Sequence, residues 1–321
     1  MKYVGLHAQQ ARNNFRSVLL LCLFPCLVLL LTLLFSVLLV CFTYERDGYA
    51  SVWELSTPLF MQMIPYVLGG VIIWFLIAYF ANTSIIQSAT GARPLERKEN
   101  KRIYNLVENL CMTQGMPMPK VNIIEDDSLN AFASGINNKT YTVSLSRGII
   151  NKLNDDELEG VIAHELSHIR NRDVRLLIVS IVFVGIFAML AQIALRSVIY
   201  SSGRSRSNNK DGAGAAAMML IALLVAAVGY FFATLMRFAI SRKREYMADA
   251  GAAGMTHKPQ ALASALRKIS QDPDIEAVTR DDVAQLFIEH PLKKKKSFSG
   301  LSSLFATHPP IKKRIEVLEQ F

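Results

Sequence analysis

An uncharged apolar run from Ser17 to Phe42 restricts the fold more than any other feature of the sequence. About 20 consecutive apolar residues form a helix long enough to cross the hydrocarbon core of a bilayer. The apolar region of a secretory signal peptide is shorter, at roughly 7–15 residues. We therefore predict a membrane-spanning helix that stays in the protein, and the mean hydropathy of +0.27 agrees with a chain that lies partly in lipid.

Three further apolar segments predict additional membrane helices. The last of them is rich in alanine and glycine, and small residues let helices pack closely in lipid. We therefore expect a mainly α membrane protein with about four transmembrane helices, at 17–42, 58–80, 176–195 and 215–240.

Basic residues around these segments predict the orientation of the chain. Lys and Arg cluster before the first segment, after the second and after the fourth, whereas the loop after the first is mostly acidic. Because short cytoplasmic loops are enriched in Lys and Arg, both termini and the soluble regions are expected in the cytoplasm. The basic loop 201–214 would then lie outside, so a partly inserted helical hairpin at 176–240 stays an alternative to two full spans.

Two polar blocks, 81–175 and 241–321, follow an N-terminal membrane region at 1–80 and flank the hairpin at 176–240. Each block is short for a domain, so we expect the two to fold together as one cytoplasmic α+β domain. Periodicity and turn residues in the first block predict a helix at 101–112 and strands at 121–125, 131–135 and 140–145. A helix should then begin at Asn154, because Asn154 and Glu157 match a capping box.

That last helix carries the sequence His164-Glu165-Leu166-Ser167-His168. Side chains four residues apart lie on one face of a helix, so both imidazoles can reach a single metal ion. Glu165 would lie close enough to meet a water on that ion without binding the ion itself. Two surface histidines on an ordinary helix are the alternative, and the apolar residues around the motif argue against it. The motif predicts a zinc site with Glu165 as the catalytic base.

A catalytic zinc ion usually takes three protein ligands, so one more ligand must come from elsewhere. Glu245 and Asp249 are again four residues apart on a predicted helix. Glu245 could bind the metal while Asp249 accepts a hydrogen bond from the far nitrogen of a ligating histidine. The spacing alone equally allows two exposed carboxylates, and the weaker rival ligands are Asp173, His257, His290 and His308.

Several stretches of the chain carry a recognisable pattern in a fixed order: 130–135, 146–148, 156–158, 164–173, 241–250 and 307–309 with 314–315. Together they resemble the HtpX-like membrane metalloproteases, relatives of the CAAX prenyl proteases in metallopeptidase family forty-eight. The resemblance implies a zincin-like catalytic domain that holds one Zn²⁺ per chain, with Glu245 as the third ligand beside His164 and His168. It also implies that Asp249 supports a ligand, that Asn130 positions substrate and that His308 stabilises the transition state.

This metal chemistry predicts a peptide hydrolase. Zinc lowers the pKa of a bound water to about 7, so Glu165 can take its proton and later pass it to the departing amine. One of the strands in 131–145 could pair with an extended peptide and so accept varied sequences. The resemblance implies proteolytic quality control in a stress response at the inner membrane of a bacterium, with the lipid bilayer and membrane or misfolded proteins as partners.

Other functions stay open from the sequence. A dedicated processing protease, for a prenylated tail for example, would be favoured by a large enclosed chamber of membrane helices. The presence of only four apparent spans argues against it. A zinc-bearing adaptor or chaperone without hydrolysis would not need Glu165. A transporter is disfavoured because no charge interrupts the first span.

Composition excludes some partners and chemistries. The net charge is +9, and the basic residues cluster beside the apolar segments. No nucleic-acid-binding motif accompanies them, so nucleic acid is not expected as a partner. The four cysteines suggest neither a disulfide framework nor a cysteine zinc site. We interpret the run Lys293 to Lys296 as a solvated loop, with contact to anionic lipid as the alternative.

Overall fold

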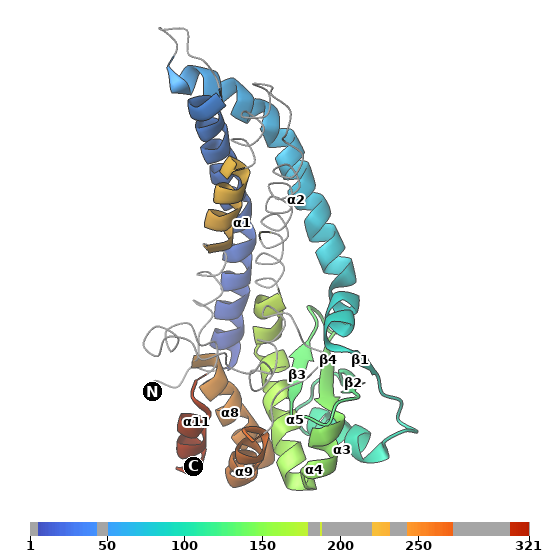
Figure 1. Ribbon diagram of the computed structural model, residues 1–321. Coiled ribbons are helices and arrows are strands. Elements are labelled where there is room, and N and C mark those ends of the chain that lie inside the picture. Colours follow the sequence, from blue (N-terminus) through green and yellow to red (C-terminus); the bar gives the residue numbers. More distant parts are fainter. Residues whose placement is uncertain are drawn as a thin grey trace. The chain divides into compact units, whose positions relative to one another are not determined.

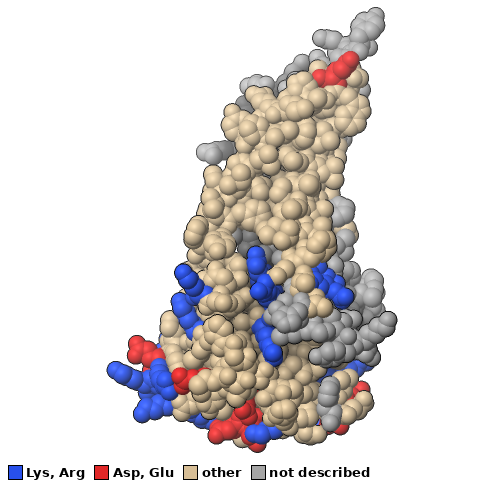
Figure 2. All heavy atoms as spheres, turned by 180° about the vertical axis from the view of Figure 1, so that it is seen from behind, with Lys and Arg blue, Asp and Glu red and all other residues tan. Residues whose placement is uncertain are grey.

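The structure is a computed structural model that describes residues 6–43, 51–178, 187, 220–231, 243–271 and 309–320. The chain divides into two compact units. The apolar unit comprises residues 18–78 and 179–237, and the polar unit comprises residues 1–17, 79–178 and 238–321. On the face seen in Figure 2, the described surface of the apolar unit is almost free of charged side chains, which gather on the polar unit.

Two long helices supply most of the described residues of the apolar unit. Helices α1 (Leu6–Thr43) and α2 (Val52–Thr90) contain stretches that are long and apolar enough to cross a membrane, at Asn14–Cys41 and Val52–Ile77. Their buried side chains form one cluster with a residue from the third predicted span: Phe24, Leu27, Leu31, Val71 and Phe187. The remaining surface of both helices is largely apolar and exposed, which suits a lipid environment.

The second apolar helix begins earlier than the sequence analysis placed it. It starts at Val52 and continues through Pro58 and Pro65. The reason is a reciprocal cap, in which the amide of Ser51 donates to the Glu54 carboxylate and the amide of Glu54 donates to Ser51 Oγ. Such a pair satisfies amides at a helix start that lack partners within the helix.

Only part of the third and fourth predicted spans can be compared with the structure. The described residues there are 176–178, Phe187 and the apolar helix Leu220–Phe231. The rest of 176–195 and 215–240, beyond Ile178, lies outside the described residues. Four complete spans therefore stay a prediction, as does a cytoplasmic domain interrupted by a membrane hairpin.

A four-stranded sheet lies at one side of the polar unit (Figure 1). Its strands are β1 (Ala92–Pro94), β2 (Lys120–Ile124), β3 (Ala131–Ser134) and β4 (Thr142–Ser146). The order is β1-β2-β4-β3, in which β2 and β4 are parallel and the other pairs antiparallel. The predicted strand pair at 131–145 is confirmed as β3 and β4, and β3 forms one edge of the sheet.

The described part of the polar unit also contains helices. They are α3 (Lys101–Thr113), α4 (Arg147–Lys152), α5 (Asp155–Arg170), α8 (Lys243–Thr256), α9 (Pro259–Ile269) and α11 (Ile311–Leu318). Of these, α4 and α5 contact the sheet. Helix α5 lies between strand β3 on one side and α8 and α9 on the other (Figure 1). The predicted capping box is confirmed at its start, where Asn154 and Glu157 each accept the other's amide. Because α5 is the buried centre of the unit, side chains in its middle are shielded from water.

Candidate metal centre

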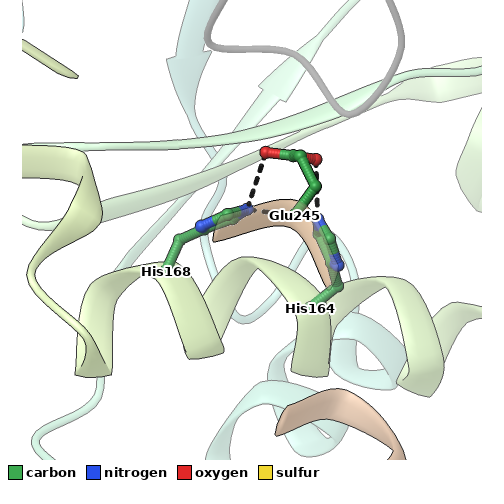
Figure 3. A group of neighbouring side chains, drawn as sticks. All are labelled: His164, His168 and Glu245. Carbon is green, nitrogen blue, oxygen red and sulfur yellow. Dashed lines mark hydrogen bonds and ion pairs between the residues drawn. The ribbon is translucent and has the colours of Figure 1, made fainter. Parts of the chain in front are cut away.

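The two histidines of the motif face each other on α5 (Figure 3). The Nε2 atom of His168 lies 3.2 Å from the Nε2 atom of His164. Their rings are nearly perpendicular, with centroids 4.7 Å apart. His164 is buried completely, whereas His168 keeps a small exposed fraction. One turn of helix therefore directs two ring nitrogens toward the same point.

Glu245 reaches this point from α8, which runs beside α5 (Figure 3). Its Oε2 atom lies 3.8 Å from His164 Nε2, and its Oε1 atom lies 3.6 Å from His168 Nε2. One ligand atom from each of the three residues falls within 4.8 Å of the others. Two imidazoles and one carboxylate are a donor set that suits zinc.

Small residues allow α8 to approach α5 this closely. Ala248 and Ala252 are buried, and Gly251 faces Ser167. A Cβ atom at Gly251 would lie 2.6 Å from Ser167 Oγ, so only glycine fits without movement. Ser167 in turn donates to the carbonyl of Ala163 at 2.8 Å, which keeps its hydroxyl against its own helix.

A carboxylate holds the far nitrogen of each histidine. Asp249 Oδ1 lies 2.9 Å from His164 Nδ1, and Asp173 Oδ2 lies 3.2 Å from His168 Nδ1. If each Nδ1 donates its proton to its carboxylate, each Nε2 keeps a lone pair. In that tautomer both lone pairs and the Glu245 carboxylate are directed at one point, which is the arrangement that a cation placed among them requires. Asp173, a rival ligand in the sequence analysis, thus lies on the opposite side of the His168 ring.

The buried charges around the site also fit a divalent cation. Four buried carboxylates, those of Glu165, Glu245, Asp173 and Asp249, lie here with the buried guanidinium of Arg314 and the half-buried one of Arg244, which donates to the backbone carbonyl of Asp173. With neutral imidazoles the formal charge is two units negative, and isolated excess charge is costly away from water. A dication would balance it. The residues present therefore fit the metal that the motif implies.

The pKa values of the two histidines shift in opposite directions. Burial lowers the pKa of His164 to about 4, which keeps that imidazole neutral. Burial also acts to lower the pKa of His168, but the hydrogen bond to Asp173 and the charge of Glu245 outweigh it and raise this pKa to about 9. The site without metal therefore attracts positive charge at His168, where a proton and a metal ion would compete.

Glu165 lies beside the first histidine on α5 and is buried. Burial raises the pKa of its carboxyl to about 7, although the nearby His168 opposes this shift. The backbone amide of Ala133, in edge strand β3, donates a hydrogen bond to the carboxylate. A carboxyl with a pKa near 7 can both accept and release a proton at neutral pH.

The remaining residues from the sequence analysis lie in different places. Asn130 is buried at the start of β3, where its Oδ1 accepts the amide of Ala131 at 3.0 Å. His257 is exposed just beyond the end of α8 with a φ of 55°, away from the buried donors. His290, His308 and the run Lys293 to Lys296 lie outside the described residues.

Sequence reasoning missed one residue in the centre of the site. Arg314, on α11, is only 1% exposed and binds both oxygens of Asp249. The only signal for it was its place in the last stretch of the family resemblance, because no spacing rule connects α11 with α5. The contact between Ala133 and Glu165 was likewise not foreseen.

Comparisons with known proteins agree on one family. The model of peptidase family M48 matches residues 97–321. A protein of Bacteroides fragilis named Protease HtpX homolog is 72% identical over the whole of both chains. A Dictyoglomus turgidum protein of the same name is 43% identical over 78% of this chain and 81% of its own length.

A solved structure also shows a likeness. It is that of Ste24p from S. mikatae, with 21% identity and a TM-score of 0.47, and the match covers 81% of this chain and 58% of that one. The family match and the two relatives are sufficient to assign the family without this structure. The chain belongs to peptidase family M48, and the protein is a metalloprotease.

Proposed function

We propose that this metalloprotease is a zinc-dependent endopeptidase of the membrane, with His164, His168 and Glu245 as ligands of one zinc ion and Glu165 as the general base. The observation that carries the proposal is the convergence of two imidazole Nε2 atoms and the Glu245 carboxylate on one buried point. Glu165 lies beside that point without being one of the three donors. Such an arrangement suits hydrolysis better than a purely structural site, which has no use for a base.

Zinc is the metal that fits best. Non-haem iron also accepts two histidines and a carboxylate, but the adjacent base favours hydrolytic chemistry over oxygenation. When bound, zinc acts as a Lewis acid that polarises a scissile carbonyl and makes a water nucleophilic at neutral pH.

Glu165 would handle the proton. Its raised pKa, about 7, lets the carboxylate accept a proton from the attacking water and return it to the amine that leaves. The amide of Ala133 holds the carboxylate in place while this happens. His308 is proposed to stabilise the transition state.

Strand β3 is the proposed substrate-binding edge. It pairs with β4 on one side, and its Ala133 amide reaches the carboxylate of Glu165. A peptide that paired with β3 would therefore pass beside the catalytic base. Main-chain pairing is tolerant of side chains, which supports a protease of broad specificity. Asn130, directly before this strand, is proposed to position the peptide.

The setting of this activity is proposed from the apolar helices. Four transmembrane helices at the bacterial inner membrane, with a cytoplasmic catalytic domain formed by 81–175 and 241–321, would place the site beside the bilayer. Such a position suits quality control of membrane or misfolded proteins. The two helices with spans at Asn14–Cys41 and Val52–Ile77 support membrane anchoring by their length and composition.

Cleavage of casein by the detergent-purified chain tests the catalytic part. The Glu165→Gln variant should lose roughly 10²–10⁴-fold in rate while keeping its bound zinc, because a general base contributes about that much. Glu159→Gln is the matched control, since Glu159 lies on the same helix and pairs with Lys258 on the surface. A Glu165→Gln variant that cleaves casein at the wild-type rate would contradict the assignment. A membrane protein substrate in proteoliposomes then tests the setting.

A further inference from the structure

The C-terminal helix α11 places a guanidinium group inside the metal centre. Arg314 donates from Nε to Asp249 Oδ2 at 2.9 Å and from Nη2 to Asp249 Oδ1 at 2.7 Å. Its third nitrogen, Nη1, lies 3.4 Å from Glu245 Oε2. A two-point pairing of guanidinium with carboxylate fixes both the position and the plane of the carboxylate.

Asp249 passes this constraint to the first histidine. Its Oδ1 atom accepts from Arg314 at 2.7 Å and lies 2.9 Å from His164 Nδ1. Arg314 Nη2 also lies 3.4 Å from His164 Nε2, but its shortest contacts are the two to Asp249. Arg314, Asp249 and His164 therefore form one group of mutual contacts next to His164 Nε2, which faces His168 Nε2 and Glu245.

Other contacts hold α11 in place without Arg314. Leu318 is completely buried, and Pro309 is buried just before the helix. An ion pair joins Glu319, at the end of α11, to Arg267 on α9. The helix therefore has a docking surface of its own, and its position does not depend on Arg314 alone.

We propose that Arg314 is a positioning residue that orients Asp249, and through it His164, so that the docked C-terminal helix is a working part of the metal centre. The inference rests on the proposed function, because it assumes that His164 binds the metal. It goes beyond that function by adding to the metal site a residue from α11, a helix that begins 55 residues after the end of α8.

Metal affinity tests this inference directly. The full-length chain is stripped of metal in detergent, loaded with Co²⁺, and titrated with a chromophoric chelator while the visible Co²⁺ spectrum is recorded. Loss of a group that orients a ligand typically weakens metal binding 10–100-fold, so Arg314→Met should raise the dissociation constant by about that factor. The dissociation constant of Arg314→Lys should lie between those of the wild type and Arg314→Met, because lysine keeps the charge but not the two-point geometry.

Arg267→Met is the matched control. It removes an arginine that contacts α11 from the exposed side, with 52% of that side chain accessible, and leaves the centre untouched. This variant should bind Co²⁺ with wild-type affinity and spectrum. Equal weakening in Arg267→Met and Arg314→Met would show that only docking of the helix matters and would overturn the inference.

A double-mutant cycle tests the route through Asp249. If Arg314 acts by orienting Asp249, adding Arg314→Met to Asp249→Asn should weaken Co²⁺ binding less than it does in the wild type. Fully additive losses would overturn the proposed route. If Arg314→Met fails to fold, Arg314→Lys and its cycle with Asp249→Asn give the same decision.

The wild type separates the two proposals. Wild-type protein that binds no Co²⁺ at this site would refute the proposed function itself. Wild-type binding that Arg314→Met and Arg314→Lys leave unchanged would refute only the role of Arg314.

Discussion

A single methyl group at Gly251 should separate the two helices that form the metal centre. A Cβ atom there would lie 2.6 Å from Ser167 Oγ and 3.1 Å from Ser167 Cβ. Rotating the hydroxyl away can relieve the first contact, at the cost of its 2.8 Å hydrogen bond to Ala163. The second contact involves an atom attached directly to the backbone, so α8 and α5 must move apart by a few tenths of an ångström.

The expected cost of Gly251→Ala follows from this geometry. Inserting a methylene group into a close-packed contact typically costs about 1–3 kcal/mol. Gly254→Ala is the matched control on the same helix, because no atom lies within 4 Å of the Cβ position there. Alanine is favoured over glycine in a helix by roughly 0.5–1 kcal/mol in both variants, so this gain cancels in the comparison. Gly251→Ala should therefore be about 1–3 kcal/mol less stable than Gly254→Ala.

The same movement should weaken metal binding. Glu245 lies on the shifted helix and both histidines lie on the other, while metal–ligand distances tolerate only about ±0.2 Å. We expect the dissociation constant for Co²⁺ to be measurably higher in Gly251→Ala than in the wild type. In Gly254→Ala it should be unchanged. Thermal unfolding of detergent-purified protein and chelator competition give the two readings.

Restoration of the space is the decisive control. Adding Ser167→Gly to Gly251→Ala removes the obstructing Cβ from the other helix and should recover part of both losses. If Gly251→Ala and Gly254→Ala behave alike in stability and in Co²⁺ affinity, the close approach of α8 to α5 does not position Glu245, and the reasoning fails.

Three other substitutions probe separate parts of the chain. Glu245→Ala leaves only the two imidazoles, so zinc measured after gel filtration should fall well below one ion per chain; full occupancy would identify another third ligand. Glu157 is buried, which alone would raise its pKa, but Lys268 and other donors lower the pKa overall. Its stabilisation is therefore present above the unfolded pKa of about 4.3 and disappears as the pH falls through the lower folded value, so the stability gap between wild type and Glu157→Gln should shrink below about pH 4. A constant gap across that range would argue against the ion pair. Gly135→Ala forces a side chain into a backbone with φ of 111° and a Cβ position 2.4 Å from Thr140 O, so it should lower the unfolding temperature; unchanged unfolding would mean that the β3–β4 turn relaxes freely.

Local patterns in the sequence account for a definite part of this protein. A capping box predicts where α5 begins, the four-residue spacing of His164 and His168 places both on one face, and an uncharged apolar run predicts a long apolar helix. These features depend on residues within a few turns of one another, and the helical repeat alone relates them. Family membership followed from the same short stretches, and the comparisons confirm it.

Tertiary packing determined the contacts between segments that are distant in the sequence, which local periodicity cannot predict. Spacing could not tell whether Glu245 faces α5 or water, because that depends on how Ala248, Gly251 and Ala252 let two helices approach each other. It also could not connect Arg314 with Asp249, since these residues are joined by no shared helix or strand. Contacts between distant segments are set by the shape and burial of a whole surface, and that information is spread over many residues at once. The helix that carries His164 and His168 was therefore readable from the sequence itself, whereas the groups that surround these two side chains come together only when α8 and α11 fold against that helix.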